Sequence, residues 1–149
     1  MTAQRMTEQR MTEQPPRLST WEARLGTYLA ERRTMPFAWG SNDCALFAAG
    51  AVEAMTGSDP AAAFRGAYRS MAGSVRALKQ HGAGTLEATI DALFPAIPTG
   101  FVRRGDLVWN GEAVGVCVGA VALFVGQEGD AAGLVRVPRA EWVKGWRVG

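Results

Sequence analysis

The chain has 149 residues, 48% of them hydrophobic and 20% charged, which is the composition of a globular protein with one core. Its formal net charge is only +2 and its arginines are scattered, which argues against a nucleic-acid-binding surface, because such a surface needs clustered cations. The longest apolar run, residues 113–126, is too short to span a membrane and contains glycines. One histidine and two cysteines without a carboxylate cluster predict no metal site and no cofactor.

The N-terminus reads MTAQRMTEQRMTEQPP, a five-residue unit repeated three times before a double proline. The repeat has no apolar period, so we expect a disordered arm over residues 1–17 and a single domain over 18–149. A second interpretation of the stretch is an over-extended start, with Met6 or Met11 as the expected alternative. No apolar segment of a secretory signal precedes the domain, so we expect a protein made and kept in the cytoplasm, or one that enters an assembly from there. Both cysteines would then be thiols.

Helical patterns occupy the first two-thirds of the domain, each with local start or stop signals. Helices are expected over residues 19–33, 43–57, a short stretch from the Asp59-Pro60 pair, 70–82 and 84–94. After Pro98 the sequence pattern changes from helical spacing to short valine-rich segments. These are GDLVW, AVGVCVGA, VALFVG and GLVRVP, with WRVG at the end. Such segments, separated by Gly and Asn, predict strands joined by tight turns. Helices first and an antiparallel sheet second give an α+β fold.

Cys44 stands directly behind Asp43 at the start of the second expected helix. A thiol in the first turn of a helix feels the positive end of the helix dipole, which favours the nucleophilic thiolate. Free cysteine is also among the most buried residue types. Cys44 is therefore either a packing residue, a nucleophile or a redox or modification site.

The stretch NDCALFAAGAVEAMTG, followed by RRGDLVW and AVGVCVGAVALFVG, resembles the landmarks of NlpC-type, papain-like cysteine peptidases. These landmarks are a D-C pair that opens a helix, a G-D strand start and a strand of the type H-V-G-I-Y. The resemblance covers residues 36–126. It implies an NlpC-type papain-like fold, with N-terminal helices packed on a small antiparallel sheet.

Residues 18–148 more closely resemble a small family of phage and prophage proteins. Five motifs carry this resemblance: F-x-W-G-x-x-D-C at 37–44, T-G-x-D-P at 56–60, R-G-x-Y at 65–68, G-D at 105–106 and the Trp146-Arg147 pair. It implies a protein associated with a phage tail, with tail proteins or cell-wall peptide as partners. Its final location would then be the virion.

The sequence departs from the peptidases at the position of their histidine, where it has Ala113. Ala113 belongs to an alternating row of small residues with Gly115 and Cys117, which we expect to face the Cys44 helix. The chain's one histidine, His81, precedes the Gly82 helix stop. It is either a cation at a helix end or, if its loop folds over Cys44, the base of a catalytic site.

Other polar and aromatic residues have a structural and a functional interpretation. Asp43 and Glu112 are poor substitutes for the base, because a carboxylate near a thiol opposes its ionisation. Asp106 is expected to bind backbone amides of a turn. Trp39 and Trp109 either line a groove or cover the core.

Two functions follow. In the first, the domain is catalytically degenerate and serves as a structural or assembly component of a phage tail. In the alternative, it is an active hydrolase of peptidoglycan peptide, with Cys44 as nucleophile, His81 as base and backbone N–H groups as oxyanion donors. The alanine at position 113 favours the first function, and the intact Asp43-Cys44 helix start favours the second. A host binding module is a third possibility.

Overall fold

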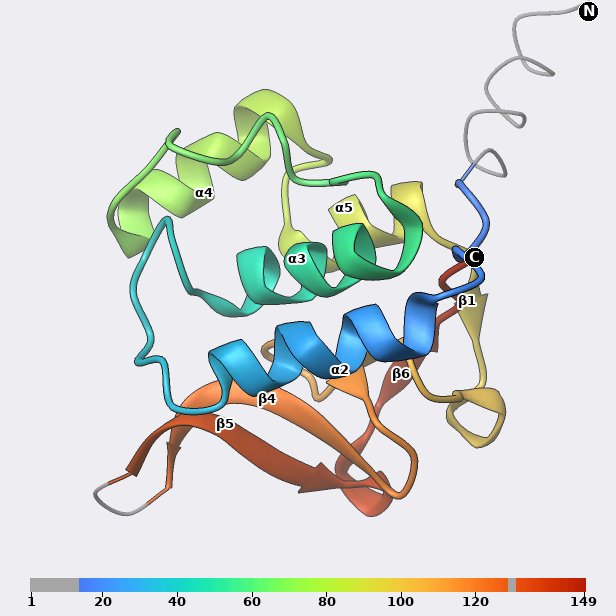
Figure 1. Ribbon diagram of the computed structural model, residues 1–149. Coiled ribbons are helices and arrows are strands. Elements are labelled where there is room, and N and C mark those ends of the chain that lie inside the picture. Colours follow the sequence, from blue (N-terminus) through green and yellow to red (C-terminus); the bar gives the residue numbers. More distant parts are fainter. Residues whose placement is uncertain (1–13, 129–130) are drawn as a thin grey trace, which may run out of the picture.

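The computed structural model describes residues 14–128 and 131–149 of the chain, so most of the expected N-terminal arm lies outside the described residues. Four α-helices precede one sheet in the chain, and α4 lies beyond α3, away from the sheet (Figure 1); the order is the one expected for an α+β fold. The helices are α2 (Trp21–Arg32), α3 (Cys44–Thr56), α4 (Met71–His81) and α5 (Leu86–Leu93). Among the described residues, no helix has the length and apolar character needed to cross a membrane.

The sheet has six strands in the order β1-β6-β2-β3-β4-β5, and every neighbouring pair is antiparallel. The strands are β1 (Ala96–Ile97), β2 (Leu107–Trp109), β3 (Val114–Cys117), β4 (Val121–Glu128), β5 (Ala131–Pro138) and β6 (Lys144–Trp146). The C-terminal β6 inserts between β1 and β2. The strand expected over the last four residues, 146–149, is displaced toward the N-terminus: β6 ends at Trp146, and residues 147–149 follow it without strand structure.

Local signals explain where α3 begins and ends. The Asp43 side chain caps the helix by accepting a hydrogen bond from the Leu46 N–H at 2.9 Å. Gly57 ends it in the left-handed conformation, with a φ of 83°. The short helix expected from Asp59 is wrong, since residues 60–66 form consecutive turns. Gly66, with a φ of 77°, interrupts any helical path there.

Both faces of the sheet are buried. One face packs against α2, α3 and α5, in a core that includes Leu25, Phe47, Met55, Ile90, Leu107 and Trp146. The opposite face packs a smaller core made of Val102, Val108, Cys117, Ala122, Phe124 and Trp142. Successive side chains of a strand point to opposite faces of the sheet, so neighbouring residues of one strand join different cores.

We predicted that the row of small residues on β3 faces α3, and that prediction is wrong. Val114 and Val116 belong to the core shared with α3, whereas Cys117 belongs to the opposite core. Gly115 faces this opposite core as well, since a Cβ there would collide with the ring of Phe124. The small residues of β3 therefore make room for an aromatic side chain of β4.

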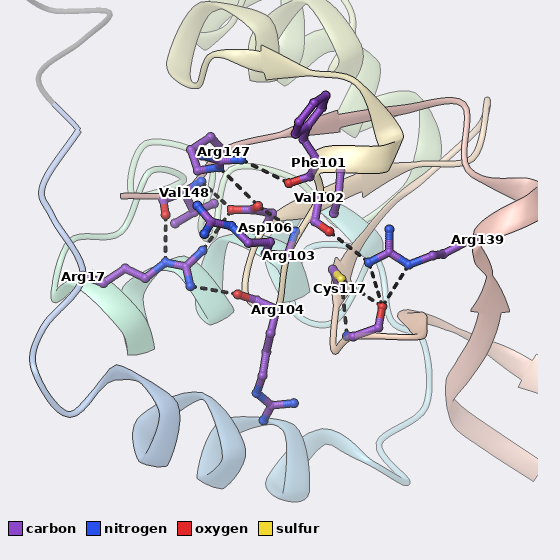
Figure 2. Close-up of polar contacts among 11 residues, drawn as sticks. Arg17, Phe101, Val102, Arg103, Arg104, Asp106, Cys117, Arg139, Arg147 and Val148 are labelled. Carbon is purple, nitrogen blue, oxygen red and sulfur yellow. Dashed lines mark hydrogen bonds and ion pairs between the residues drawn. The ribbon is translucent and has the colours of Figure 1, made fainter.

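The buried carboxylate of Asp106 joins the two ends of the domain (Figure 2). It accepts hydrogen bonds from Arg17 at 2.9 Å, from the Val148 N–H at 3.1 Å and from the Arg103 N–H at 2.9 Å. The Arg147 Nε lies 3.3 Å from its second oxygen. The bond from Arg103 confirms the expected turn contact.

Arg17, which we assigned to the arm, is bound into the domain. Besides Asp106, its guanidinium donates to the carbonyls of Val148 and Arg104, each at 2.8 Å. It also lies over the Trp21 ring, 4.3 Å from the ring centre. These contacts place the start of the ordered domain before residue 18.

Candidate functional site

Asp43 and Cys44 form the start of α3, where the sequence predicted a site. The Asp43 carboxylate is buried and accepts three hydrogen bonds. The donors are the Leu46 N–H at 2.9 Å, the Gly40 N–H at 3.0 Å and the Tyr68 hydroxyl at 2.5 Å. Asp43 is therefore held as a structural anchor, and its acceptor sites are occupied by the fold.

Tyr68 brings the R-G-x-Y motif to the D-C motif. Its hydroxyl bonds to Asp43, and its backbone carbonyl lies so close to Gly40 that a Cβ at position 40 would collide with it. Gly40 also has a φ of 82°, which favours glycine. We had given Tyr68 no role from the residues, and its place in the motif was the one signal available.

Asn42 fixes the loop that leads to the site. Its amide donates to the carbonyls of Met35 and Pro36, at 3.1 and 2.9 Å, and accepts from Arg32 at 3.3 Å. The side chain is 2% exposed. Together with the Ala38–Asn42 bridge, these bonds give the loop before Cys44 a defined path.

The Cys44 thiol lies between α3 and the start of β3. Burial raises its pKa, and the neighbouring Asp43 carboxylate acts in the same direction. The N–H groups of Val114, Ala45 and Cys44 itself oppose this rise but do not overcome it. The sulfur is therefore a protonated thiol at neutral pH, despite its place at a helix N-terminus.

His81 lies at the exposed end of α4, where its ring packs edge-on against Phe64 with 5.9 Å between ring centres. It is not among the residues that line the cavity at Cys44. The structure therefore brings Cys44 together with Asp43 and Tyr68, and places His81 elsewhere. Glu112 is exposed in the turn before β3.

The two tryptophans singled out from the sequence have different surroundings. Trp109 is 8% exposed and packs edge-on against Trp146, in the core between sheet and helices. Trp39 is 38% exposed and stands edge-on to Phe37, with 4.8 Å between ring centres. Trp109 is thus a core residue, and Trp39 is available at the surface beside the site.

Cys44 opens onto a cavity of about 110 Å³. The first turns of α3 form one wall, and α4, α5 and the turns of residues 60–68 form the others. Val114 and Leu107 contribute from the sheet. Among the described residues, no group of three or more His, Cys, Asp or Glu side chains is placed to hold a metal ion. The arrangement offers an apolar cavity beside one thiol.

Comparison with known proteins identifies a family for this chain. No curated protein and no solved structure is similar enough to this chain to match it. The family described as Domain of unknown function (DUF6950) matches residues 16–148. This span begins just before Arg17 and includes every element from α2 to β6. The chain therefore belongs to the DUF6950 family.

Proposed function

We propose that this protein is a catalytically silent NlpC-like domain that serves as a structural or assembly component of a phage tail. The observation that carries the silent assignment is the surroundings of the Cys44 sulfur. Its neighbour on β3 is Val114, its pKa is raised by burial, and the His81 ring packs against Phe64 on the surface. A cysteine hydrolase needs a base within hydrogen-bond reach of the thiol.

The NlpC-like arrangement is supported by the order and placement of three features. A cysteine begins a helix, that helix packs on an antiparallel sheet, and the strand start that meets the sulfur follows the Gly105-Asp106 strand start in the chain. The peptidases that the sequence resembles have their histidine beside this strand start. Here the neighbouring residues are Ala113 and Val114.

The tail assignment is supported by the resemblance to phage and prophage proteins, because the residues of those motifs build this framework. Gly40, Asp43 and Tyr68 hold the helix start through direct contacts. Asp59 and Arg65 form an ion pair at 2.6 Å in the turns above the helix. Motifs used for architecture are compatible with a domain retained for its shape.

One observation favours the alternative, a cysteine hydrolase. The sulfur lines a cavity, and the N–H groups of Val114, Ala45 and Cys44 all act to lower its pKa. Such N–H groups could also stabilise an oxyanion. In this alternative a base would have to reach Cys44 from a second protein.

The test is the pH dependence of Cys44 alkylation by iodoacetamide in the Cys117→Ser protein, with a Cys44→Ser, Cys117→Ser protein as the blank. We expect a midpoint above about 8.5, the ordinary value for a thiol. A midpoint below about 7.5, together with release of peptides from purified peptidoglycan, would overturn the silent assignment.

The tail assignment has its own test. Mass spectrometry of virions purified from the encoding phage or prophage is expected to detect the protein among the tail components. Deletion of its gene is expected to reduce the number of complete tails seen by electron microscopy. Virions that lack the protein, or a deletion strain that makes a normal number of complete tails, would contradict a structural role.

A further inference from the structure

The cavity beside Cys44 lies between α3 on one side and α4 and α5 on the other. Its walls are almost entirely apolar, with Leu46, Val52, Phe64, Leu78, Ile90 and Leu93 among them. Protein interiors have few voids larger than a water molecule, because empty space forfeits dispersion contacts. A void of about 110 Å³ is several times that size.

The polar groups in the walls are bonded within the protein. Asp43 and Tyr68 bond to each other. The Thr89 hydroxyl donates to the Thr85 carbonyl at 2.6 Å, and the Ser74 hydroxyl donates to the Met71 carbonyl at 2.6 Å. The Asp43 carboxylate is occupied by its three donors and the hydroxyls already donate within the protein, so these groups leave no free donor for a polar ligand. The cavity matches a ligand that brings only hydrocarbon surface.

The rim of the cavity continues this apolar surface to the exterior. Trp39 lines the cavity and is also 38% exposed. Phe37, which stands edge-on to Trp39, is 41% exposed. Exposed aromatic surface therefore adjoins the cavity lining at Trp39.

We propose that this cavity binds a neutral hydrocarbon group about the size of a benzene ring. An engineered apolar cavity of about 150 Å³ stays dry and binds benzene, so the volume here is of the right order. The group can be a free small molecule or the apolar end of a larger one. Cys44 lines the cavity and therefore reports its occupancy through its reactivity. The proposal goes beyond the structural role and stands independently of it.

Benzene is the probe for the test, with benzoate as its charged counterpart. At a benzene concentration that fills four-fifths of the sites, the melting temperature of the full chain should rise by about 2–4 °C. Alkylation of Cys44 in the Cys117→Ser protein should slow about fivefold, because one-fifth of the sites stay open. Benzoate should cause neither change, because nothing in the cavity walls pairs with its carboxylate.

Two substitutions of alanine by leucine show where benzene binds. Ala45→Leu places extra side-chain volume in the cavity wall and should abolish both benzene effects. Ala92→Leu, on the exposed side of α5 and outside the cavity, should leave both effects intact. Equal benzene effects in the Ala45→Leu protein would overturn the proposal.

Methyl NMR of the wild-type chain gives an answer even if Ala45→Leu does not fold. Benzene should shift the methyl signals of Leu46, Val52 and Ile90, which line the cavity, and leave those of Val102 and Val108 in the opposite core unchanged. No shift, or shifts confined to exposed residues, would overturn the proposal. A low pKa of Cys44 would overturn the silent function and would leave this binding result untouched.

Discussion

The Tyr68 hydroxyl donates a hydrogen bond to the Asp43 carboxylate at 2.5 Å, across 25 residues of sequence. This bond links the turns above α3 to the cap of that helix. It also accounts for one of the three donors that occupy Asp43. Asp43, the residue beside the Cys44 thiol, therefore stabilises the start of α3. The aromatic ring of Tyr68 also lines one side of the cavity.

Tyr68→Phe should lower the free energy of unfolding by about 1.5–3 kcal/mol, because a hydrogen bond to a charged group is lost and a buried acceptor is left with fewer donors. Tyr28→Phe is the matched control. Its hydroxyl donates to the neutral carbonyl of Phe47 at 2.8 Å, so the loss should be about 0.5–1.5 kcal/mol. Urea denaturation measures both. A larger loss for Tyr28→Phe would contradict the assigned role of Asp43.

The two tyrosines, Tyr28 and Tyr68, are the only ones in the chain, and both should resist ionisation in the folded protein. Burial raises the pKa of each hydroxyl, and the hydrogen bond to Asp43 raises that of Tyr68 further. Above pH 10 the unfolded chain loses these protons while the native protein keeps them. The free energy of unfolding should therefore fall as the pH rises, by up to about 1.4 kcal/mol per pH unit for each tyrosine.

Absorbance at 295 nm separates this effect from the thiols, whose pKa values are also raised by burial. Tyrosinate absorbance should appear only with unfolding, monitored by circular dichroism in the same samples. Tyrosinate absorbance at pH 10.5 with native circular dichroism would contradict the prediction.

The sequence predicted α3 and the sheet because their signals are local. Asp43 and Gly57 mark the two ends of the helix through cap bonds made within a few residues. The strand segments are short and separated by turn residues. The sequence could not place His81, since its position depends on how α4 sits above α3 and on the packing of Phe64.

Other features depended on contacts between distant segments. The orientation of β3 was predicted from side-chain size alone, but Phe124 from β4 occupies the side on which Gly115 lies. Arg17 looked like part of a polar arm until its contacts with Asp106 were seen. The cavity itself has no signal in the sequence, because it lies between α3, α4 and α5, whose relative positions are set by contacts between distant segments.

Two glycines in neighbouring helices should respond to alanine in opposite directions. Gly50 on α3 lies against the Tyr28 hydroxyl, so a Cβ there would collide with it. Gly50→Ala should cost about 1–3 kcal/mol through overpacking. Gly26 on α2 has open space where its Cβ would be, so Gly26→Ala should stabilise by about 0.5–1 kcal/mol through helix propensity. Thermal denaturation measures both effects. A Gly50→Ala protein that melts at or above the wild-type temperature would contradict the close approach of α2 to α3.

Arg17 should contribute to stability through its ion pair with the buried Asp106. Arg17→Ala removes that pair and two further hydrogen bonds, and it should cost about 3 kcal/mol because a buried carboxylate loses a partner. Arg103→Ala is the control, since the backbone N–H of that residue makes the contact with Asp106 and is retained. Its effect should stay within about 0.5 kcal/mol. A loss for Arg17→Ala that stays within about 0.5 kcal/mol, as for Arg103→Ala, would contradict a stabilising ion pair between Arg17 and Asp106.

Restoring a histidine at position 113 should fail to activate Cys44. Ala113 packs against the core on the far side of the sheet, whereas Val114 belongs to the core shared with α3 and its N–H acts on the sulfur. Ala113→His should therefore leave the pH profile of Cys44 alkylation unchanged. Val114→His points the imidazole toward α3 and should lower the midpoint by about one pH unit, because the neutral ring can accept the thiol proton and the imidazolium that forms then stabilises the thiolate.

Val114→Asn is the control for the histidine at 114, since it also places a polar group in the core but carries no titratable ring. Both Val114 variants should lose about 1–3 kcal/mol of stability, so the alkylation profiles are compared at a temperature where each protein stays folded. A lowered midpoint in Ala113→His with none in Val114→His would reverse the assigned faces of β3. It would also bring the site closer to the peptidase arrangement, because the imidazole would then reach the sulfur from the position that holds histidine in those enzymes.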